Sequence, residues 1–118
     1  MKINTYRSPN HSIDKRKNKD IKFIVIHYTG MQSELECIKR LTSNKSEVST
    51  HFLINRKGNI TRMVDENKIA WHAGKSKWKN FINLNYQSIG IELVNKGHQF
   101  GYENFSKKQI SNLILLCK

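Results

Sequence analysis

The stretch KFIVIHYTG, residues 22–30, places a histidine at the point where an apolar segment gives way to a turn. Residues 21–27 are a nearly continuous run of β-branched and aromatic side chains, which is typical of a strand buried on both faces. A second run of this kind, SIGIELVN at 88–95, carries a glutamate, Glu92. Both segments are expected to be strands, and each carries an ionisable side chain.

Two other segments have the periodicity of amphipathic helices. Each begins with a capping box, in which a serine is followed three residues later by Glu or Gln: Ser33 with Glu36, and Ser106 with Gln109. The apolar faces expected on these helices are Leu35, Ile38 and Leu41 on the first, and Ile110, Leu113, Ile114 and Cys117 on the second. The second helix reaches the last residue with no glycine, no cap and no return to polar sequence.

The remaining segments complete the expected sheet. Two alternating segments, 48–54 and 60–64, flank NRKG and predict a β-hairpin. IAWHAG at 69–74 is expected to be a strand end or a loop, and residues 1–20 an irregular N-terminal arm. The expected fold class is therefore α/β, with a mixed central β-sheet flanked by helices in a single domain over residues 21–118.

The composition limits the partners. A net charge of +12 is typical of nucleic-acid binding, but the basic residues are spread over the chain, and the densest stretch, DKRKNKDIK, contains acids and no aromatics. We therefore expect no nucleic-acid partner. No apolar run approaches the roughly 20 residues of a membrane helix, so no membrane partner is expected. Two distant cysteines and the lack of an apolar leader favour the cytoplasm, with the periplasm left open.

Three ionisable residues fall at or near the ends of expected sheet elements: His27, His72 and Glu92. Strand ends meet at one rim of a sheet, which can bring these side chains together. A lone histidine is either a satisfied core residue or a ligand. A carboxylate within SIGIELV would otherwise pay for its burial, which favours a functional role for Glu92.

Four segments together resemble a known family: FIVIHYTG, VSTHFLINRKGNI, IAWHAGKSKW and INLNYQSIGIELVN. They are similar to the type 2 N-acetylmuramoyl-L-alanine amidases, zinc enzymes of cell-wall cleavage. These enzymes share a fold with peptidoglycan recognition proteins and amidase-type phage lysozymes. SPN at 8–10 also resembles the family's N-terminal segment, so the likeness runs from about Ser8 to the C-terminus.

The resemblance implies a function and a site. The reaction would be hydrolysis of the amide between the muramic acid lactyl group and L-alanine, in peptidoglycan or its muropeptide fragments. His27 would be a Zn²⁺ ligand, and Glu92 the general base that takes a proton from the attacking water. The residues implied in the substrate groove are His72, Trp71, Trp78 and Asn85. His51 is expected to be a second-layer or packing residue, His98 an exposed loop residue and His11 part of the arm.

The resemblance also implies two further zinc ligands, a histidine and an aspartate or cysteine, in a segment that would follow the last helix. We find no match to that segment in the 118 residues. A C-terminally truncated amidase is the interpretation we favour, and without the segment one sheet edge and one helix face would be uncovered. The alternatives are completion by another chain or a second copy, and a non-catalytic module that binds muropeptide or peptidoglycan.

Overall fold

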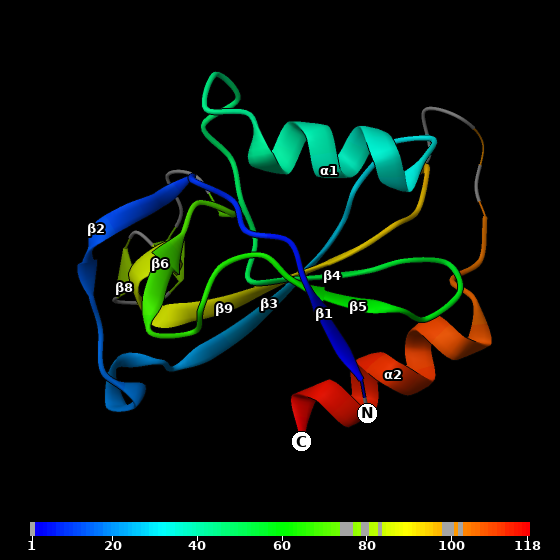
Figure 1. Cartoon of the computed structure of the whole chain (residues 1–118). Coiled ribbons are helices and arrows are strands. Elements are labelled where there is room, and N and C mark those ends of the chain that lie inside the picture. The colour runs from blue at the N-terminus through cyan, green and yellow to red at the C-terminus, as the bar shows by residue number, and fades with distance from the viewer. Residues whose placement is uncertain (1, 74–76, 79–80, 83, 98–100, 102) are drawn as a thin grey trace.

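The computed structural model describes residues 2–73, 77–78, 81–82, 84–97, 101 and 103–118. A mixed sheet lies between two helices, α1 (Glu34–Thr42) on one face and α2 (Lys107–Cys117) on the other, as Figure 1 shows. The strands are β1 Ile3–Thr5, β2 His11–Lys15, β3 Phe23–Tyr28, β4 Phe52–Ile54, β5 Ile60–Arg62, β6 Lys68–Ala70, β7 Lys77–Trp78, β8 Phe81–Ile82 and β9 Ser88–Leu93. Short 3₁₀ turns cover Asn18–Asp20 and Leu84–Gln87.

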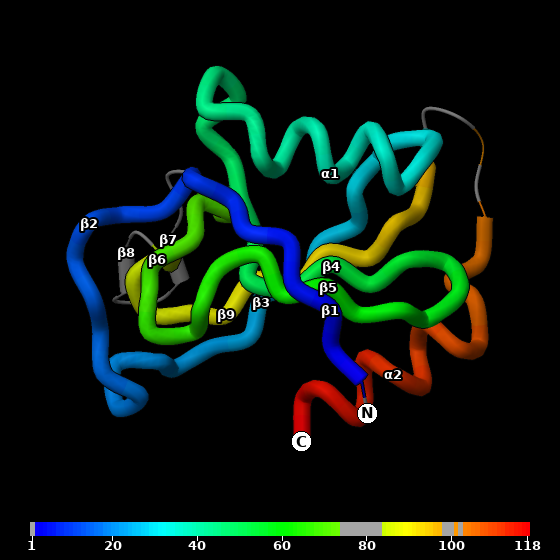
Figure 2. The backbone as a smooth tube through the Cα atoms, viewed as in Figure 1, coloured from blue at the N-terminus to red at the C-terminus, as the bar shows by residue number. Residues whose placement is uncertain are grey.

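The main sheet has the strand order β1-β5-β4-β9-β3. Strands β4 and β5 pair antiparallel, whereas β1 with β5, β4 with β9, and β9 with β3 are parallel. Strands β2 and β6 form a separate small sheet, and β7 pairs with β8. The path of the chain through these elements can be followed in Figure 2. The expected α/β class with a mixed central sheet is confirmed.

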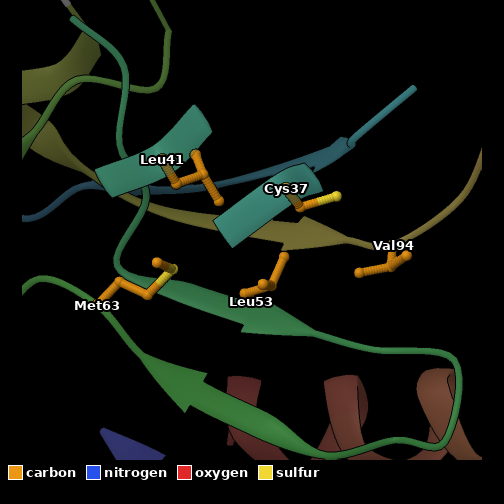
Figure 3. Packing of buried hydrophobic residues seen from close by; sticks show 5 residues of the cluster. All are labelled: Cys37, Leu41, Leu53, Met63 and Val94. Atoms are coloured by element: carbon orange, nitrogen blue, oxygen red, sulfur yellow. The ribbon is translucent and has the colours of Figure 1, made fainter. Parts of the chain in front are cut away.

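Each face of the sheet carries its own core, because side chains alternate along a strand. The face toward α1 is built from Cys37, Leu41, Leu53, Met63 and Val94, which Figure 3 shows gathered between the helix and the strands. The opposite face is built from Phe52, Ile54, Ile60, Ile91 and Leu93, with Leu113 and Leu116 of α2 packed against it. Burial of these two apolar clusters holds both helices to the sheet.

The hairpin and the helix starts are confirmed. Strands β4 and β5 pair around the turn Asn55–Gly58, where Gly58 adopts a φ of 88° that favours glycine. The hydroxyl oxygen of Ser33 accepts a hydrogen bond from the Glu36 N–H, and Ser106 and Gln109 form a full capping box.

The contact faces of the helices differ from the sequence-based expectation. In α1 the expected Leu41 is buried and the expected Ile38 packs against the core cluster, whereas Leu35 is 62% exposed and Cys37 is buried instead. In α2 the contact face contains Gln109, Leu113 and Leu116, whereas Ile114 is 53% exposed. In both helices the observed face is rotated from the expected one, because the neighbouring strands decide which side is covered.

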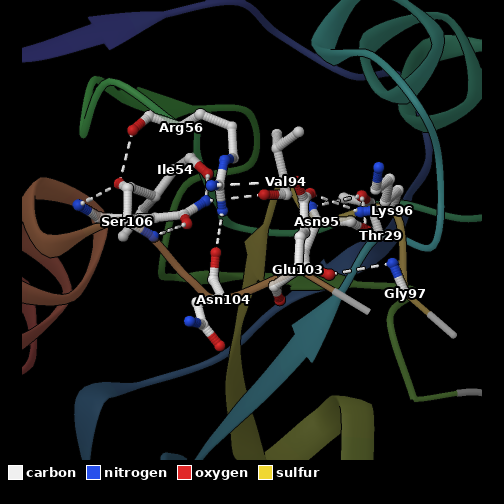
Figure 4. Close-up of polar contacts among 11 residues, drawn as sticks. Thr29, Ile54, Arg56, Val94, Asn95, Lys96, Gly97, Glu103, Asn104 and Ser106 are labelled. Atoms are coloured by element: carbon white, nitrogen blue, oxygen red, sulfur yellow. Dashed lines mark hydrogen bonds and ion pairs between the residues drawn. The ribbon is translucent and has the colours of Figure 1, made fainter. Parts of the chain in front are cut away.

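Hydrogen bonds fix the start of α2 to the sheet, as Figure 4 shows. The Gln109 amide is fully buried and donates to the carbonyls of Ile54 and Val94, at 3.1 and 2.9 Å. The Ser106 hydroxyl donates to the Arg56 carbonyl at 2.5 Å. One polar side chain thus joins α2 to the ends of β4 and β9.

The prediction of an irregular arm over residues 1–20 is wrong. Strand β1 pairs with β5 in the main sheet, and β2 pairs with β6. Between them Ser8 and Asn10 are buried, and the Asn10 amide donates to the carbonyls of Ser43 and Val48, both at 2.8 Å. The N-terminal residues are therefore tied to the loop that follows α1.

The prediction that the first apolar run is buried on both faces is also wrong. Among the described residues β3 lies at the edge of the main sheet, and Ile24, Ile26 and Tyr28 are 46%, 50% and 50% exposed. These three side chains alternate with the half-buried Phe23, Val25 and His27. On α2, Ile114 and Leu115 are likewise 53% and 50% exposed. Neither helix of the described part of the chain has the length and apolar character of a membrane-spanning helix.

Candidate active site

The histidine of β3 and the glutamate of β9 lie side by side. β3 and β9 are parallel neighbours in which His27 is the register partner of Glu92. Paired residues of neighbouring strands point to the same face of a sheet. The sheet therefore presents an imidazole and a carboxylate together on the face toward α1.

Glu92 is a carboxylate whose pKa is raised by its surroundings. Burial raises its pKa to about 7, and the positive charge of Arg40 acts weakly in the opposite direction. A group whose pKa lies near neutrality can both accept and return a proton. Glu92 lines a pocket of about 200 Å³ that also contains Arg40, Thr29, His72 and Trp71.

His27 is joined to His72 and through it to Ser88. The Nε2 of His27 lies 3.0 Å from the Nδ1 of His72, and the Nε2 of His72 lies 2.9 Å from the Ser88 hydroxyl. That hydroxyl also donates to the Leu84 carbonyl at 2.6 Å. Burial lowers the pKa of His27, and lowers that of His72 to about 3, with positive charge on His27, His51 and Arg16 adding to the effect. The three side chains form one continuous hydrogen-bonded chain.

His51 lies behind this chain and is fully buried. Its ring centroid is 6.1 Å from that of His72, and its Nδ1 accepts a hydrogen bond from the Gly90 N–H at 3.0 Å. Its Nε2 lies 2.9 Å from the Lys68 carbonyl oxygen, which accepts its proton. Burial lowers the pKa of His51 to about 4. The position agrees with the expected second-layer or packing role.

Arg16 was missed by the sequence analysis. It belongs to the basic stretch DKRKNKDIK, in which the sequence analysis assigned no residue a role, yet it is 5% exposed. Its guanidinium donates to the carbonyls of Glu66, Asn85 and Tyr86, at 3.0, 3.0 and 2.7 Å. It thereby fixes the segment that leads into β9. No feature of the sequence distinguishes Arg16 from its exposed basic neighbours.

The residues expected in the substrate groove lie in different parts of the structure. Trp71 lines the pocket, and its indole N–H donates to the Ser12 hydroxyl at 3.0 Å. The Asn85 side-chain oxygen accepts from the N–H groups of His72 and Ala73, at 3.1 and 2.8 Å, so Asn85 supports the His72 backbone. Trp78 lies in β7, and its side chain is outside the described part of the structure. His98 also falls outside the described residues.

The described residues do not by themselves fit a zinc ion. Catalytic zinc is held by three protein ligands in most enzymes. In the described part of the chain, no group of three or more His, Cys, Asp or Glu side chains is arranged so that it could hold a metal ion. His27 is the ligand candidate that the resemblance implies, and a complete set would need donors beyond those described.

Comparisons with known proteins show which family the chain matches. Residues 17–118 match the protein family described as N-acetylmuramoyl-L-alanine amidase. The chain is 38% identical to the N-acetylmuramoyl-L-alanine amidase AmiD of Escherichia coli over 83% of its length, and 33% identical to the 1,6-anhydro-N-acetylmuramyl-L-alanine amidase AmpD of Haemophilus influenzae over 86%. It spans 39% of the length of the first relative and 66% of the second.

A solved structure shows the same arrangement of elements. It is a complex of E. coli AmiD with the substrate anhydro-N-acetylmuramic acid-L-Ala-D-γ-Glu-L-Lys. The two structures superpose with a TM-score of 0.75 at 34% identity, over 92% of this chain and 45% of the other. The fold described above is therefore that of known amidases.

Proposed function

This chain belongs to the N-acetylmuramoyl-L-alanine amidase family, and from that membership we propose that it hydrolyses the amide between the lactyl group of muramic acid and L-alanine. The observation that carries the proposal is the register pairing of His27 with Glu92, a carboxylate whose pKa is raised to about 7 by burial. The similarity to AmiD, solved with an anhydromuramyl tripeptide, supports a muropeptide as the substrate.

Glu92 has the properties that the proton transfers of this reaction need. In its ionised form the carboxylate accepts a proton from the water that attacks the lactyl carbonyl carbon. The proton then passes to the amide nitrogen as the C–N bond breaks. One water is thereby added across the amide, which yields a lactyl carboxylate and a free amine. A pKa of about 7 allows Glu92 to accept and return the proton near neutral pH.

The pocket supplies the surroundings of this step. Trp71 and His72 form part of its wall, and the exposed Arg40 places a positive charge in the same pocket. A guanidinium favours the carboxylates that a muropeptide carries. We propose that Trp71 and His72 line the substrate groove and that Asn85 supports it, as the resemblance implies.

Zinc is the cofactor that we propose for this site, with His27 as one ligand. Because no group of three donors among the described residues could hold a metal ion, the remaining ligands would come from residues outside the described part, a second copy or a complementing chain. The measurement is the number of zinc ions held per chain. We expect His27→Ala to lower it and His11→Ala, on β2, to leave it unchanged; equal zinc content in all three proteins would contradict the assignment.

A second function is favoured by that same incomplete donor set, namely binding of muropeptide without cleavage. The two functions are separated by one experiment on the full chain, with zinc and anhydro-N-acetylmuramic acid-L-Ala-D-γ-Glu-L-Lys. Wild type should release the tripeptide, and Glu92→Gln should be slower by about 10²- to 10⁴-fold with binding retained. The exposed Asp14→Asn serves as the control. Binding of the muropeptide without release of the tripeptide by wild type would favour the second function. A wild type that neither binds nor cleaves the muropeptide would contradict both functions.

A further inference from the structure

Among the described residues that line the pocket of Glu92, Arg40 is the one arginine or lysine. It lies on α1 between two buried residues that anchor the helix to the sheet, Cys37 at 1% and Leu41 at 3% exposure. The Arg40 side chain itself is exposed, and its positive charge acts on the Glu92 carboxylate. The guanidinium therefore lies where the pocket opens to solvent, on a backbone that the core holds in place.

The guanidinium of Arg40 is available to a ligand. In the described part of the chain no carboxylate forms an ion pair with it. Glu36 lies one helical turn earlier, at a spacing that allows such a pair, yet the two side chains are not paired. An arginine side chain presents five N–H donors in a planar fork that matches the two oxygens of a carboxylate. The pocket thus carries an unoccupied carboxylate-binding group.

The remainder of the pocket wall fits the groups on either side of the amide to be cut. Met31, Leu41 and Val48 contribute apolar side chains. The lactyl–L-alanine amide has a methyl group on each side, one on the lactyl carbon and one on the alanine Cα, and apolar surface favours both. The next unit of the stem peptide is D-γ-Glu, which is linked onward through its side chain and so keeps a free α-carboxylate. Methyl groups followed by a carboxylate match an apolar wall with a guanidinium at its edge.

Chain length selects this carboxylate among those that the substrate carries. The α-carboxylate of D-γ-Glu is attached one residue beyond the amide to be cut, and one extended residue spans about 3.3–3.6 Å. The carboxylate of the third residue lies beyond the whole γ-linked side chain. We infer that Arg40 is a specificity-determining residue that binds the α-carboxylate of the second stem residue, so that the site prefers D-γ-Glu to its α-amide, D-isoglutamine. This inference rests on the proposed function and deepens it.

The test compares two muropeptides that differ only at that carboxylate. One is anhydro-N-acetylmuramic acid-L-Ala-D-γ-Glu-L-Lys, and the other carries D-isoglutamine in place of D-γ-Glu. Dissociation constants are measured by titration calorimetry on the zinc-supplemented full chain with Glu92→Gln, which slows cleavage. We expect the free acid to bind about 5- to 30-fold more tightly than the amide, because the pair is charge-assisted but partly exposed to solvent. Arg40→Gln in the same protein should bring the ratio of the two constants close to one.

A neighbouring lysine supplies the matched control. Lys39 is exposed on the same helix and is not among the residues that line the pocket. Lys39→Gln removes the same charge one position away, so we expect it to retain the preference. A ratio near one in the parent protein, a ratio that Arg40→Gln leaves unchanged, or equal losses in the two variants would overturn the inference. The ratio is taken within each protein, so that a general loss of stability does not affect it.

The fate of the proposed function is read separately, from cleavage by wild type. Cleavage of both muropeptides with no preference in binding would overturn the role of Arg40 and leave the amidase reaction standing. A preference that depends on Arg40, without cleavage by wild type, would support the role of Arg40 and count against the reaction. Failure to bind either muropeptide would overturn the inference about Arg40, whatever the outcome for cleavage.

Discussion

His27 on β3 and Glu92 on β9 are register partners in neighbouring parallel strands, and both side chains project from the sheet toward α1. The carboxylate is largely withdrawn from water, and burial raises its pKa to about 7. A strand of a buried sheet retains a costly carboxylate only where it is used or compensated. The consequences can be measured in stability as well as in activity.

Replacing Glu92 by glutamine should stabilise the protein in a pH-dependent manner. Between pH 4.5, the ordinary pKa of Glu92, and about 7, its pKa in the folded protein, the folded state keeps a proton that the unfolded chain has released. The free energy of unfolding therefore falls as the pH rises through this window. We expect Glu92→Gln to exceed wild type at pH 8 by roughly 1–3 kcal/mol in free energy of unfolding, and to lose this advantage by pH 4.5. Urea unfolding at both values checks this, with Asp14→Asn as the control. A gap that does not change with pH would contradict it.

His51 should make the protein sensitive to acid. Its folded pKa of about 4 lies below the ordinary value of 6.5, so the unfolded chain binds more protons in that interval and stability falls as the pH falls through it. The free energy of unfolding of wild type, relative to His51→Gln, should drop by roughly 2–3 kcal/mol between pH 7 and 4. Chemical unfolding across this range provides the measurement. A constant difference between the two proteins would exclude His51 as a source of acid sensitivity.

Gly90→Ala should destabilise the protein through one neighbour, the ring of His72. The added Cβ would overlap that ring, which should cost about 1–3 kcal/mol as overpacking. In a His72→Ala background the same change should cost less than about 0.5 kcal/mol, because the overlapping atoms are gone. The four unfolding free energies form a double-mutant cycle. Equal costs in the two backgrounds would show that His72 is not what requires glycine there.

Arg16 should be needed for stability despite its place in a basic stretch. Lysine cannot reproduce the planar fork that reaches the carbonyls of Glu66, Asn85 and Tyr86. We expect Arg16→Lys to lower the free energy of unfolding by about 2–3 kcal/mol. The exposed Lys19→Ala, from the same stretch, should change it by less than about 0.5 kcal/mol. Similar small effects for both would mean that the buried guanidinium contributes little.

Local signals in the sequence predicted several elements because short-range physics decides them. The turn NRKG, the two serine caps and the alternation around the hairpin act within a few residues, and all are present. The sequence also predicted that His27 and Glu92 lie close together, because both fall at or near strand ends that can meet at one rim of the sheet. The assignment of catalytic and binding roles to these residues stays a prediction.

Other features depend on contacts between distant segments. Strand β1 is three residues long, and its partner β5 begins at Ile60, so nothing near residues 3–5 reveals it. An apolar run such as β3 shows that a strand forms but not whether both of its faces are covered. The partners of Arg16 and His72 are likewise far away in the sequence, in segments that only the folded sheet brings together.

The most direct test locates the bond that is cut. Anhydro-N-acetylmuramic acid-L-Ala-D-γ-Glu-L-Lys is incubated with the zinc-supplemented chain in H₂¹⁸O, and both products are weighed by mass spectrometry. We expect one ¹⁸O in the lactyl carboxylate of the sugar product and none in the released tripeptide, because water adds to the lactyl carbonyl carbon. Label in a peptide carboxylate, or an uncleaved substrate, would contradict the proposed amidase reaction.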